Sequence, residues 1–268
     1  MDTFVNESDF ALLEKDRYTF NVLIRILRGE CDLVLSDHRS LIICHSDTKQ
    51  GYPIWVWTPD GCGEAEMERA WREINACRPV KDGYRYNLKY DLMDYFMRRA
   101  AETGTEMEIA VNMFAYDCPK IIEPEIKADG ELHQCTPEEA DEVIARKKEF
   151  YAAIGETVGD LAAFEDAARE QVARGTYYFW KNGEGKTVGS CAYRAVGKDA
   201  TVNGVLVSEE YRRMHYARNM VYGITKMLME RGYTPMLYTD ADYAASNACY
   251  TKIGYVKRGA LCTIQKKG

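Results

Sequence analysis

The stretch from Val205 to Ala217 carries the residues best suited to chemistry in this chain of 268 residues. It starts as an apolar run, passes through an acidic turn, and reaches two adjacent arginines, Arg212 and Arg213, where a helix is predicted to begin. The first N–H groups of a helix have no partner within the helix, and the helix dipole favours negative charge there. A strand that leads through an arginine-bearing loop into a helix therefore predicts a phosphate site. In a plainer interpretation, the arginines are solvated or paired with Glu209 and Glu210.

The elements that would position this loop follow from hydrophobic spacing and turn residues. Downstream of residue 128 the predicted order is a strand at 130–135, helices at 136–153 and 160–174, strands at 176–181, 186–194 and 200–207, a helix after the loop, a strand at 236–239, a helix at 244–253 and a last strand or hairpin arm at 255–265. Thr136 and Glu139 form a predicted capping box at the first of these helices. The aromatic run at 177–180 is expected in the core more than in an acceptor pocket.

The residues before 128 predict a separate unit. Helical spacing covers 8–28, with a break near Asp16, and the later predicted elements are a hairpin at 31–44, a strand at 52–58, helices at 64–77 and 91–103, and strands at 84–88 and 106–116. Pro119 and Pro124 then favour an extended linker. We therefore expect two domains, residues 1–128 and 129–268, of mixed α+β class.

Composition limits the classes of function. The formal net charge is −7 and the pI is about 5.3, which argues against a nucleic-acid-binding protein, since phosphate contacts need a basic surface. No basic leader or membrane-spanning run is apparent, and nine scattered cysteines without a CxxC pair are typical of a cytoplasmic protein. The four histidines show no ligand spacing, so no metal site is predicted.

The predicted element order, with its arginine-rich loop, resembles the GNAT superfamily of acyl-CoA N-acyltransferases. The phosphate loop of that family is Gln/Arg-x-x-Gly-x-Gly/Ala, and this chain has the segment Arg212-Arg213-Met214-His215-Tyr216-Ala217. Arg212 and Ala217 match the pattern, whereas His215 stands where the first glycine belongs. A structural substitution is the favoured interpretation of His215, because histidine tolerates positive φ better than most residues.

A second motif strengthens the resemblance. Residues 246–255 read SNACYTKIGY, similar to the family pattern Ser-Asn-x-x-Tyr-x-x-x-Gly-Phe/Tyr. The resemblance covers roughly residues 129–268 and is greatest to the subgroup whose catalytic half follows a divergent N-terminal domain. The aromatic run at 52–58 and the helix after it could be the remnant of a second, degenerate copy of the same fold.

The chemistry of acetyl transfer assigns expected roles to these residues. Backbone N–H groups from Arg213 to Ala217 (Met214, His215 and Tyr216 included) would hold the pyrophosphate of acetyl-CoA, and an amide near Leu206 or Val207 would polarise the thioester carbonyl. Tyr250 would protonate the leaving thiolate, since a phenol and a thiol have comparable pKa values. Asn247, three residues earlier on the same helix, would also face the cofactor. The plainer alternatives are a packed tyrosine and a capping asparagine.

The predicted function is therefore a cytoplasmic, acetyl-CoA-dependent N-acetyltransferase. It would transfer acetyl directly to an amine of a small molecule or peptide, as a monomer or homodimer, without a nucleic-acid or membrane partner. The general base is not identified among Glu209, Asp240 and Asp242, and the two aspartates could instead attract a cationic acceptor. The alternatives are a non-catalytic GNAT-fold module that binds acyl-CoA or has lost it, and a purely structural tandem-domain protein.

Overall fold

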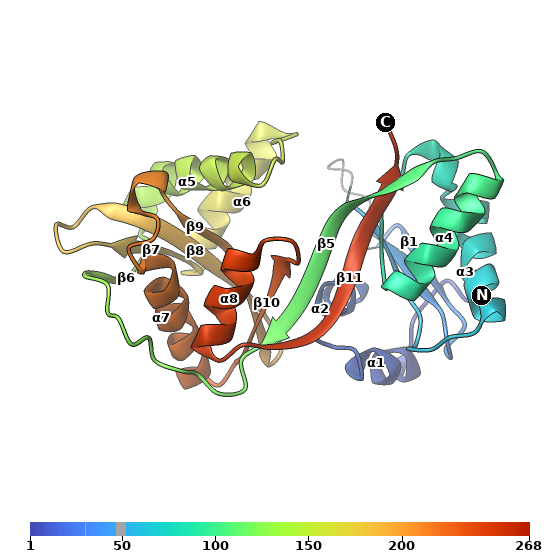
Figure 1. The fold of residues 1–268 in the computed structure, drawn as a ribbon, viewed down its shortest axis with the longest axis horizontal. Helices are drawn as coiled ribbons and strands as arrows, with labels where there is room; N and C mark the ends of the chain where they lie inside the picture. Colours follow the sequence, from blue (N-terminus) through green and yellow to red (C-terminus); the bar gives the residue numbers. More distant parts are fainter. Residues whose placement is uncertain (30, 47–51) are drawn as a thin grey trace. The chain divides into compact units, whose positions relative to one another are not determined.

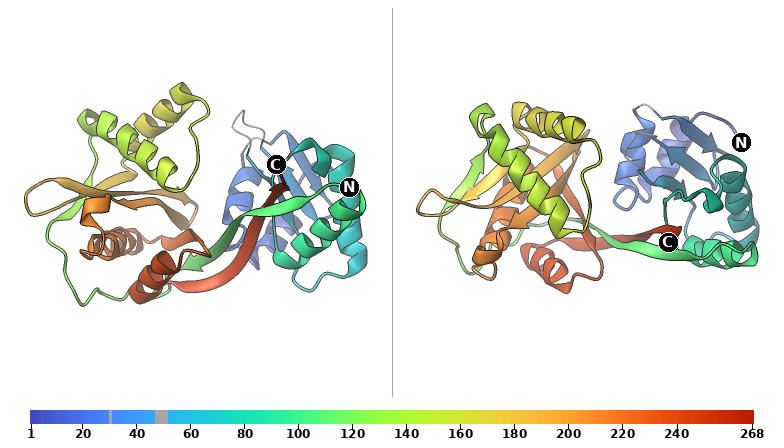
Figure 2. Two further views of the ribbon diagram at one scale, coloured as in Figure 1. Left: turned by 45° about the horizontal axis from the view of Figure 1, so that its top comes forward. Right: turned by 90° about the horizontal axis from the view of Figure 1, so that it is seen from above.

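The computed structural model describes residues 1–29, 31–46 and 52–268, which form two compact units (Figures 1 and 2). The first unit contains residues 1–115, 240–242 and 258–268, and the second contains residues 116–239 and 243–257. The domain boundary near residue 128 stays a prediction, while the compact units part between Ala115 and Tyr116. The mixed α+β class, with a mostly antiparallel sheet flanked by helices, is confirmed.

The first unit is built mainly from the first half of the chain. Its elements are α1 (Glu7–Glu14), α2 (Asn21–Leu27), β1 (Leu33–Ser36), β2 (Ile42–His45), β3 (Ile54–Trp57), α3 (Glu64–Cys77), β4 (Tyr86–Leu88), α4 (Tyr90–Glu102) and most of β5 (Met107–Asp117). Strands β1, β2 and β3 are antiparallel, whereas β4 runs parallel to β3. The predicted helical region at 8–28 is indeed broken near Asp16, because α1 and α2 are separate helices.

The second unit holds the loop that the sequence singles out. Its elements are β6 (Glu131–Gln134), α5 (Ala140–Ala153), α6 (Leu161–Ala173), β7 (Tyr177–Lys181), β8 (Thr187–Val196), β9 (Asp199–Val207), α7 (Tyr216–Glu230), β10 (Thr234–Asp240) and α8 (Ala244–Ile253). Strands β6 to β9 are antiparallel neighbours, and β10 pairs parallel to β9. Helices α5 and α6 lie on one face of this sheet, and α7 and α8 lie on the other (Figures 1 and 2).

The aromatic run on β7 fills the core on both faces of the sheet. Tyr177 and Phe179 belong to the cluster formed with α5 and α6. The hydroxyl of Tyr178 contacts Met227 Sδ of α7 at 3.6 Å, and Trp180 lies beside Gly223 of the same helix. Since alternate strand residues point to opposite faces, this run of four aromatic residues packs against the helices on both faces of the sheet. The expectation that this run is core is consistent with its burial.

From the first helix of each half, α1 and α5, the two halves of the chain have the same element order: two helices, three antiparallel strands, a helix, a strand, a helix and a strand. The second half has one additional strand, β6, before its helices. In both halves the third strand of the antiparallel set pairs in parallel with the next strand, β3 with β4 and β9 with β10. The loop and helix after β3 therefore correspond in order to the arginine-bearing loop and α7 after β9.

The last strand of each half reaches the other unit. Strand β11 (Val256–Lys266) follows α8, but the chain from residue 258 onward belongs to the first unit, where Cys262 pairs with Leu88 of β4. In turn, the end of β5 belongs to the second unit, and the Cys118 amide just after it donates to the Pro235 carbonyl of β10 at 2.9 Å. Each unit is thus completed by residues from both halves of the sequence.

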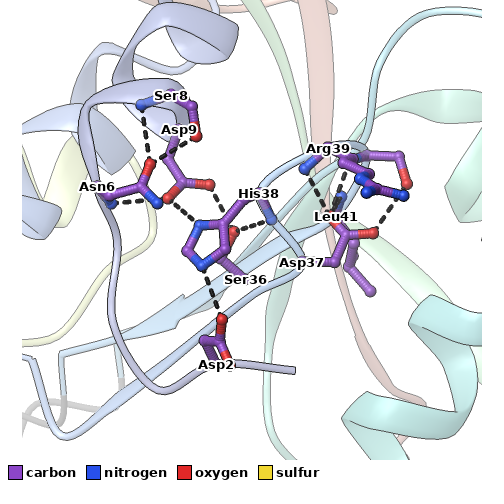
Figure 3. A network of polar contacts seen from close by, with 10 residues as sticks. Asp2, Asn6, Ser8, Asp9, Ser36, Asp37, His38, Arg39 and Leu41 are labelled. Atoms are coloured by element: carbon purple, nitrogen blue, oxygen red, sulfur yellow. Dashed lines mark hydrogen bonds and ion pairs between the residues drawn. The ribbon is translucent and has the colours of Figure 1, made fainter.

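A polar network anchors the N-terminal segment to the β1–β2 hairpin (Figure 3). The fully buried Asp9 carboxylate lies 2.7 Å from His38 Nδ1 and accepts a hydrogen bond from Ser36 Oγ at 2.5 Å. The other ring nitrogen of His38 lies 3.0 Å from Asp2 Oδ2. The hydrogen bond to Asp9 is the largest cause that raises the pKa of His38. This network explains how a turn with His38 at a φ of 58° is held.

The Glu139 carboxylate is held by several hydrogen bonds just before α5 in the second unit. Its carboxylate accepts hydrogen bonds from Lys181 Nζ at 2.6 Å and the Thr136 amide at 2.9 Å, and lies 2.8 Å from His133 Nε2. The predicted capping box is present, although its first turn is a 3-10 turn before α5. Burial raises the pKa of Glu139, but these hydrogen bonds outweigh it and lower the pKa to about 2.

We expect Glu139→Gln to lower the free energy of unfolding at pH 7 by about 2–3 kcal/mol. The folded-state pKa lies below the unfolded value, so the stabilisation is complete above about pH 5 and is lost as the pH falls towards 2. Urea unfolding at pH 7, 4 and 2.5 should show the difference between variant and wild type shrinking. The control is Glu142→Gln, an exposed residue of α5, which should change stability by less than about 0.5 kcal/mol at any pH.

Candidate active site

The start of the arginine-bearing loop, residues 208–215, is fixed by backbone and side-chain contacts. The Ser208 amide donates to the Val188 carbonyl at 3.1 Å. Arg146 of α5 donates to Ser208 Oγ at 2.5 Å and to the Thr187 carbonyl at 3.0 Å. Sequence reasoning missed Arg146, because it lies 62 residues from Ser208 along the chain and no local pattern marks the contact.

The end of the loop is held where α7 begins. The Tyr216 hydroxyl donates to Asp129 Oδ1 at 2.5 Å, while Asp129 Oδ2 accepts from the Gly183 amide at 2.8 Å. Asn219 Nδ2 donates to the carbonyls of His215 and Ile126, each at 3.0 Å. The side chain of Tyr216 is therefore structural, and the contribution of this residue to a ligand would come from its backbone N–H.

The loop backbone has the shape of an anion-binding turn. Arg213 and His215 both adopt left-handed conformations, with φ of 65° and 67°, whereas Met214 between them does not. Each such residue costs about 1–2 kcal/mol relative to ordinary backbone, and strain of this kind persists where surrounding contacts impose it. When left-handed residues alternate with residues of ordinary backbone, successive N–H groups point towards the same concave side of the turn. His215 thus has a backbone conformation that glycine adopts without steric cost.

Positive charge and exposure coincide at this turn. Arg212, Arg213 and His215 are exposed, and Met214 is 50% exposed. Within the described part of the chain, neither arginine forms an ion pair with Glu209 or Glu210. The α7 helix has 15 residues, and its first N–H groups, from Tyr216 and Ala217 onward, add the positive end of its dipole. Two guanidinium groups and a strained N–H turn can together hold a polyanion such as a pyrophosphate.

The strand that leads into the loop parts from its neighbour. The parallel register between β9 and β10 ends at Val202 paired with Leu237, five residues before β9 ends. On the other side, β9 stays paired with β8 as far as Val207 opposite Gly189, with an irregularity beyond Ser190 opposite Leu206. The edge of β9 that faces away from β8 is therefore unpaired near Leu206 and Val207. An extended polar chain can pair with such an edge.

Helix α8 holds the two residues of the second motif. The Asn247 amide group donates to the Tyr243 carbonyl at 3.1 Å, and its oxygen accepts from the Tyr116 hydroxyl at 3.3 Å. Tyr250 is 8% exposed and its ring meets that of Tyr255 at 6.0 Å in an edge-on arrangement. Burial is the largest cause that raises the pKa of Tyr250 well above its ordinary range. The phenol is therefore neutral, while Asn247 is engaged in local packing.

The carboxylates considered as bases are placed differently from one another. Glu209 is exposed in the loop. Asp240 and Asp242 belong to the first compact unit, where Asn112 of β5 donates to Asp242 Oδ2 at 2.7 Å and Tyr90 of α4 donates to Asn112 at 2.8 Å. Asp242 is thus oriented by a neighbouring amide, a contact that sequence spacing did not indicate.

In the described ranges 1–29, 31–46 and 52–268, no three or more His, Cys, Asp or Glu side chains are arranged to hold a metal ion. None of the helices there has the length and apolar character needed to cross a membrane.

Comparison with known proteins finds one family model that matches part of the chain and solved structures that share its fold. Residues 142–255 match the model of the acetyltransferase (GNAT) family. The chain resembles a GNAT-family acetyltransferase from Colwellia psychrerythraea (TM-score 0.60, 14% identity, 99% of each chain). It also resembles GCN5-related N-acetyltransferases from Sphaerobacter thermophilus (TM-score 0.64, 9% identity, 97% of this chain and 91% of that one) and Kribbella flavida (TM-score 0.61, 14% identity, 96% of each chain). Identities this low indicate a shared fold. No curated protein matches the chain.

The left-handed backbone at His215 can be tested by two substitutions. Glycine adopts a φ of 67° without steric cost, whereas a β-branched residue does so only with strain. We expect His215→Gly to leave the free energy of unfolding within about 1 kcal/mol of wild type, and His215→Val to lower it by about 2 kcal/mol. Urea unfolding of both variants measures this. Equal stability of the two variants would show that the loop does not require positive φ here.

Proposed function

Because residues 142–255 match the model of the acetyltransferase (GNAT) family, we propose that this protein is an N-acetyltransferase that uses acetyl-CoA. It transfers acetyl directly from the thioester to an amine, within a complex of enzyme and both substrates. The observation that carries the proposal is the loop before α7, where Arg213 and His215 hold left-handed backbone beside the exposed Arg212. Strain of this kind, at a helix N-terminus with two cations, suits a pyrophosphate.

The residues of the loop and of β9 would bind the cofactor. Backbone N–H groups from Arg213 to Ala217 would hold the pyrophosphate, with Arg212 adding charge. The unpaired edge of β9 would accept the extended arm of the cofactor as an additional strand. A backbone amide near Leu206 or Val207 would then donate to the thioester carbonyl, where negative charge develops in the transition state. Acetyl-CoA itself supplies the activated acyl group.

Tyr250 is the proposed general acid. A phenol whose pKa is raised by burial keeps its proton at the pH values where an amine reacts. It can therefore give that proton to the departing thiolate. Asn247 is proposed to lie along the cofactor, with its amide held by Tyr116 and Tyr243. Assignment of a base is left open among Glu209, Asp240 and Asp242.

The acceptor is proposed to be an amine of a small molecule or peptide. We also expect the protein to act in the cytoplasm, as a monomer or a homodimer, and without nucleic acid or membrane. The repeated element order supports the further proposal that the first half derives from a second copy of the fold. Its loop after β3 reads TPDGCG at 58–63, without an arginine, so it has lost the residues that would hold a pyrophosphate.

One observation favours a second candidate, a module that binds acyl-CoA without turnover. The Tyr250 side chain is largely inside the unit and Asn247 makes local hydrogen bonds. Both residues could therefore serve packing alone. Two measurements, one of binding and one of turnover, separate the candidates.

Binding is tested by calorimetric titration of the protein with acetyl-CoA. We expect Arg212→Ala to weaken the affinity about ten- to a hundredfold, since a hydrogen bond to a charged group contributes about 1.5–3 kcal/mol. Its free energy of unfolding should not change, because Arg212 is exposed. The matched control is Arg194→Ala, an exposed arginine on β8 of the same unit, which should bind like wild type. A protein that binds nothing at millimolar acetyl-CoA is neither the enzyme nor the cofactor-binding module.

Turnover is tested by thiol release with a panel of amines. We expect Tyr250→Phe to lower kcat about a hundredfold with little change in acetyl-CoA affinity, because only the acidic proton is removed. Tyr255→Phe is the control, since its hydroxyl bonds to Thr225 Oγ1 at 2.8 Å and has no proposed role in transfer. Full activity of Tyr250→Phe would remove the acid assignment. Tight acetyl-CoA binding with no acetylated amine would favour the non-catalytic module.

A further inference from the structure

The first unit contains a cavity at the carboxyl end of its parallel strand pair. Strand β3 ends at Trp57 and β4 at Leu88, and the residues that follow them, Asp60 and Lys89–Asp91, line a cavity of about 160 Å³. Asp16, from the connection between α1 and α2, and Arg258, from β11, complete its charged lining. Ligands in open sheets bind outside the carboxyl ends of parallel strands, so the position itself is typical of a ligand site.

The repeated element order gives this position a counterpart. In the second half of the chain, the parallel pair is β9 and β10. The arginine-bearing loop follows β9, and the connection to α8 follows β10. The cavity in the first unit therefore occupies the place that corresponds, in element order, to the candidate active site. The chemistry differs, because the loop after β3 contains Asp60, whereas the corresponding loop after β9 contains arginines.

A buried lysine forms the floor of the cavity. The Lys89 side chain is 9% exposed and its Nζ lies 2.7 Å from Asp16 Oδ2 and 2.6 Å from Asp60 Oδ1. Asp16 Oδ2 also accepts from Trp57 Nε1 at 2.8 Å, which fixes its position. Asp60 is 85% exposed, so its second oxygen is open to solvent. One ammonium is thus matched by two carboxylates, although a single carboxylate would neutralise it.

The charged side chains of the lining carry a net negative charge. Asp91 adds a third carboxylate on the first turn of α4, where the helix dipole favours it, and in the described residues its carboxylate has no hydrogen-bonding partner. Three carboxylates stand against the cationic groups of Lys89 and Arg258, which leaves one negative charge in excess. An anion would be repelled from this lining, whereas a cationic donor would find carboxylate oxygens of Asp60 and Asp91.

We propose that this cavity binds the ammonium group of a small aliphatic amine. Its volume is equivalent to about five water molecules at about 30 Å³ each, which suits an aminoalkyl group and excludes a large ring system. Tyr90 lies beside these charged residues in the lining. The inference does not require acetyl transfer, because the site lies within the first unit alone.

The test is calorimetric titration of the full chain with 1,4-diaminobutane at pH 7 and low salt, without acetyl-CoA. We expect saturable binding that weakens as salt is added, and no binding of butane-1,4-diol, which has the same length without charge. Asp91→Asn should weaken diamine binding about two- to fivefold, the effect of one partly exposed ion pair. Asp94→Asn, an exposed aspartate on the same helix outside the cavity lining, should bind like wild type.

Two results would overturn the inference. One is the absence of saturable diamine binding to wild type at ligand concentrations up to about 10 mM. The other is equal weakening by Asp91→Asn and Asp94→Asn, which would mean general attraction to an acidic surface. Thermal unfolding of both variants shows whether each is folded. Because acetyl-CoA is omitted, failure here leaves the proposed acetyl transfer untouched, and failure of acetyl transfer leaves this site untouched.

Discussion

The pairing of β11 with β4 is the contact on which the first unit depends. Cys262, Thr263 and Ile264 lie opposite Leu88, Asn87 and Tyr86, and Cys262 and Ile264 are fully buried in the core of that unit. Without them, the N–H and C=O groups of β4 would lack partners on one edge, and the core would lose two apolar side chains. Unpaired buried backbone groups are costly, so the C-terminal strand is required for the unit that the N-terminal half builds.

The strand that pairs with β4 is connected directly to α8, a helix of the candidate active site. Helix α8, which carries Asn247 and Tyr250, stops at Gly254 with a φ of 106°. A Cβ atom there would lie 2.0 Å from the Lys120 carbonyl oxygen, so only glycine fits the turn from α8 into β11. The helix is therefore fixed at its end by backbone packing in the second unit, and the strand that leaves it is fixed by the sheet of the first.

Much of the second unit could be predicted from sequence because its signals are local. The capping box at Thr136, the hairpin residues 182–185 and the apolar stripe of α7 each act over a few positions, and the structure has the corresponding elements. The membership of β11 in the first unit could not be predicted, since 174 residues separate Cys262 from Leu88. The contacts of Arg146 with Ser208 and of Asp129 with Tyr216 were missed for the same reason. The site residues themselves remain predictions, with a backbone conformation at His215 that suits them.

The pairing of the C-terminal strand β11 with β4 of the first unit also has a consequence for synthesis on the ribosome. Domains generally fold from the N-terminus as the chain emerges. Here β4 cannot form its pairing with β11 until a further 174 residues have been synthesised. At about 5–20 residues per second, that delay is roughly 10–35 s. During this time the edge of β4 and the core around Leu88 are open to chaperones and to other nascent chains. A chain that ended before Val256 would contain the whole arginine-bearing loop but an unfinished first unit, which proteases can recognise.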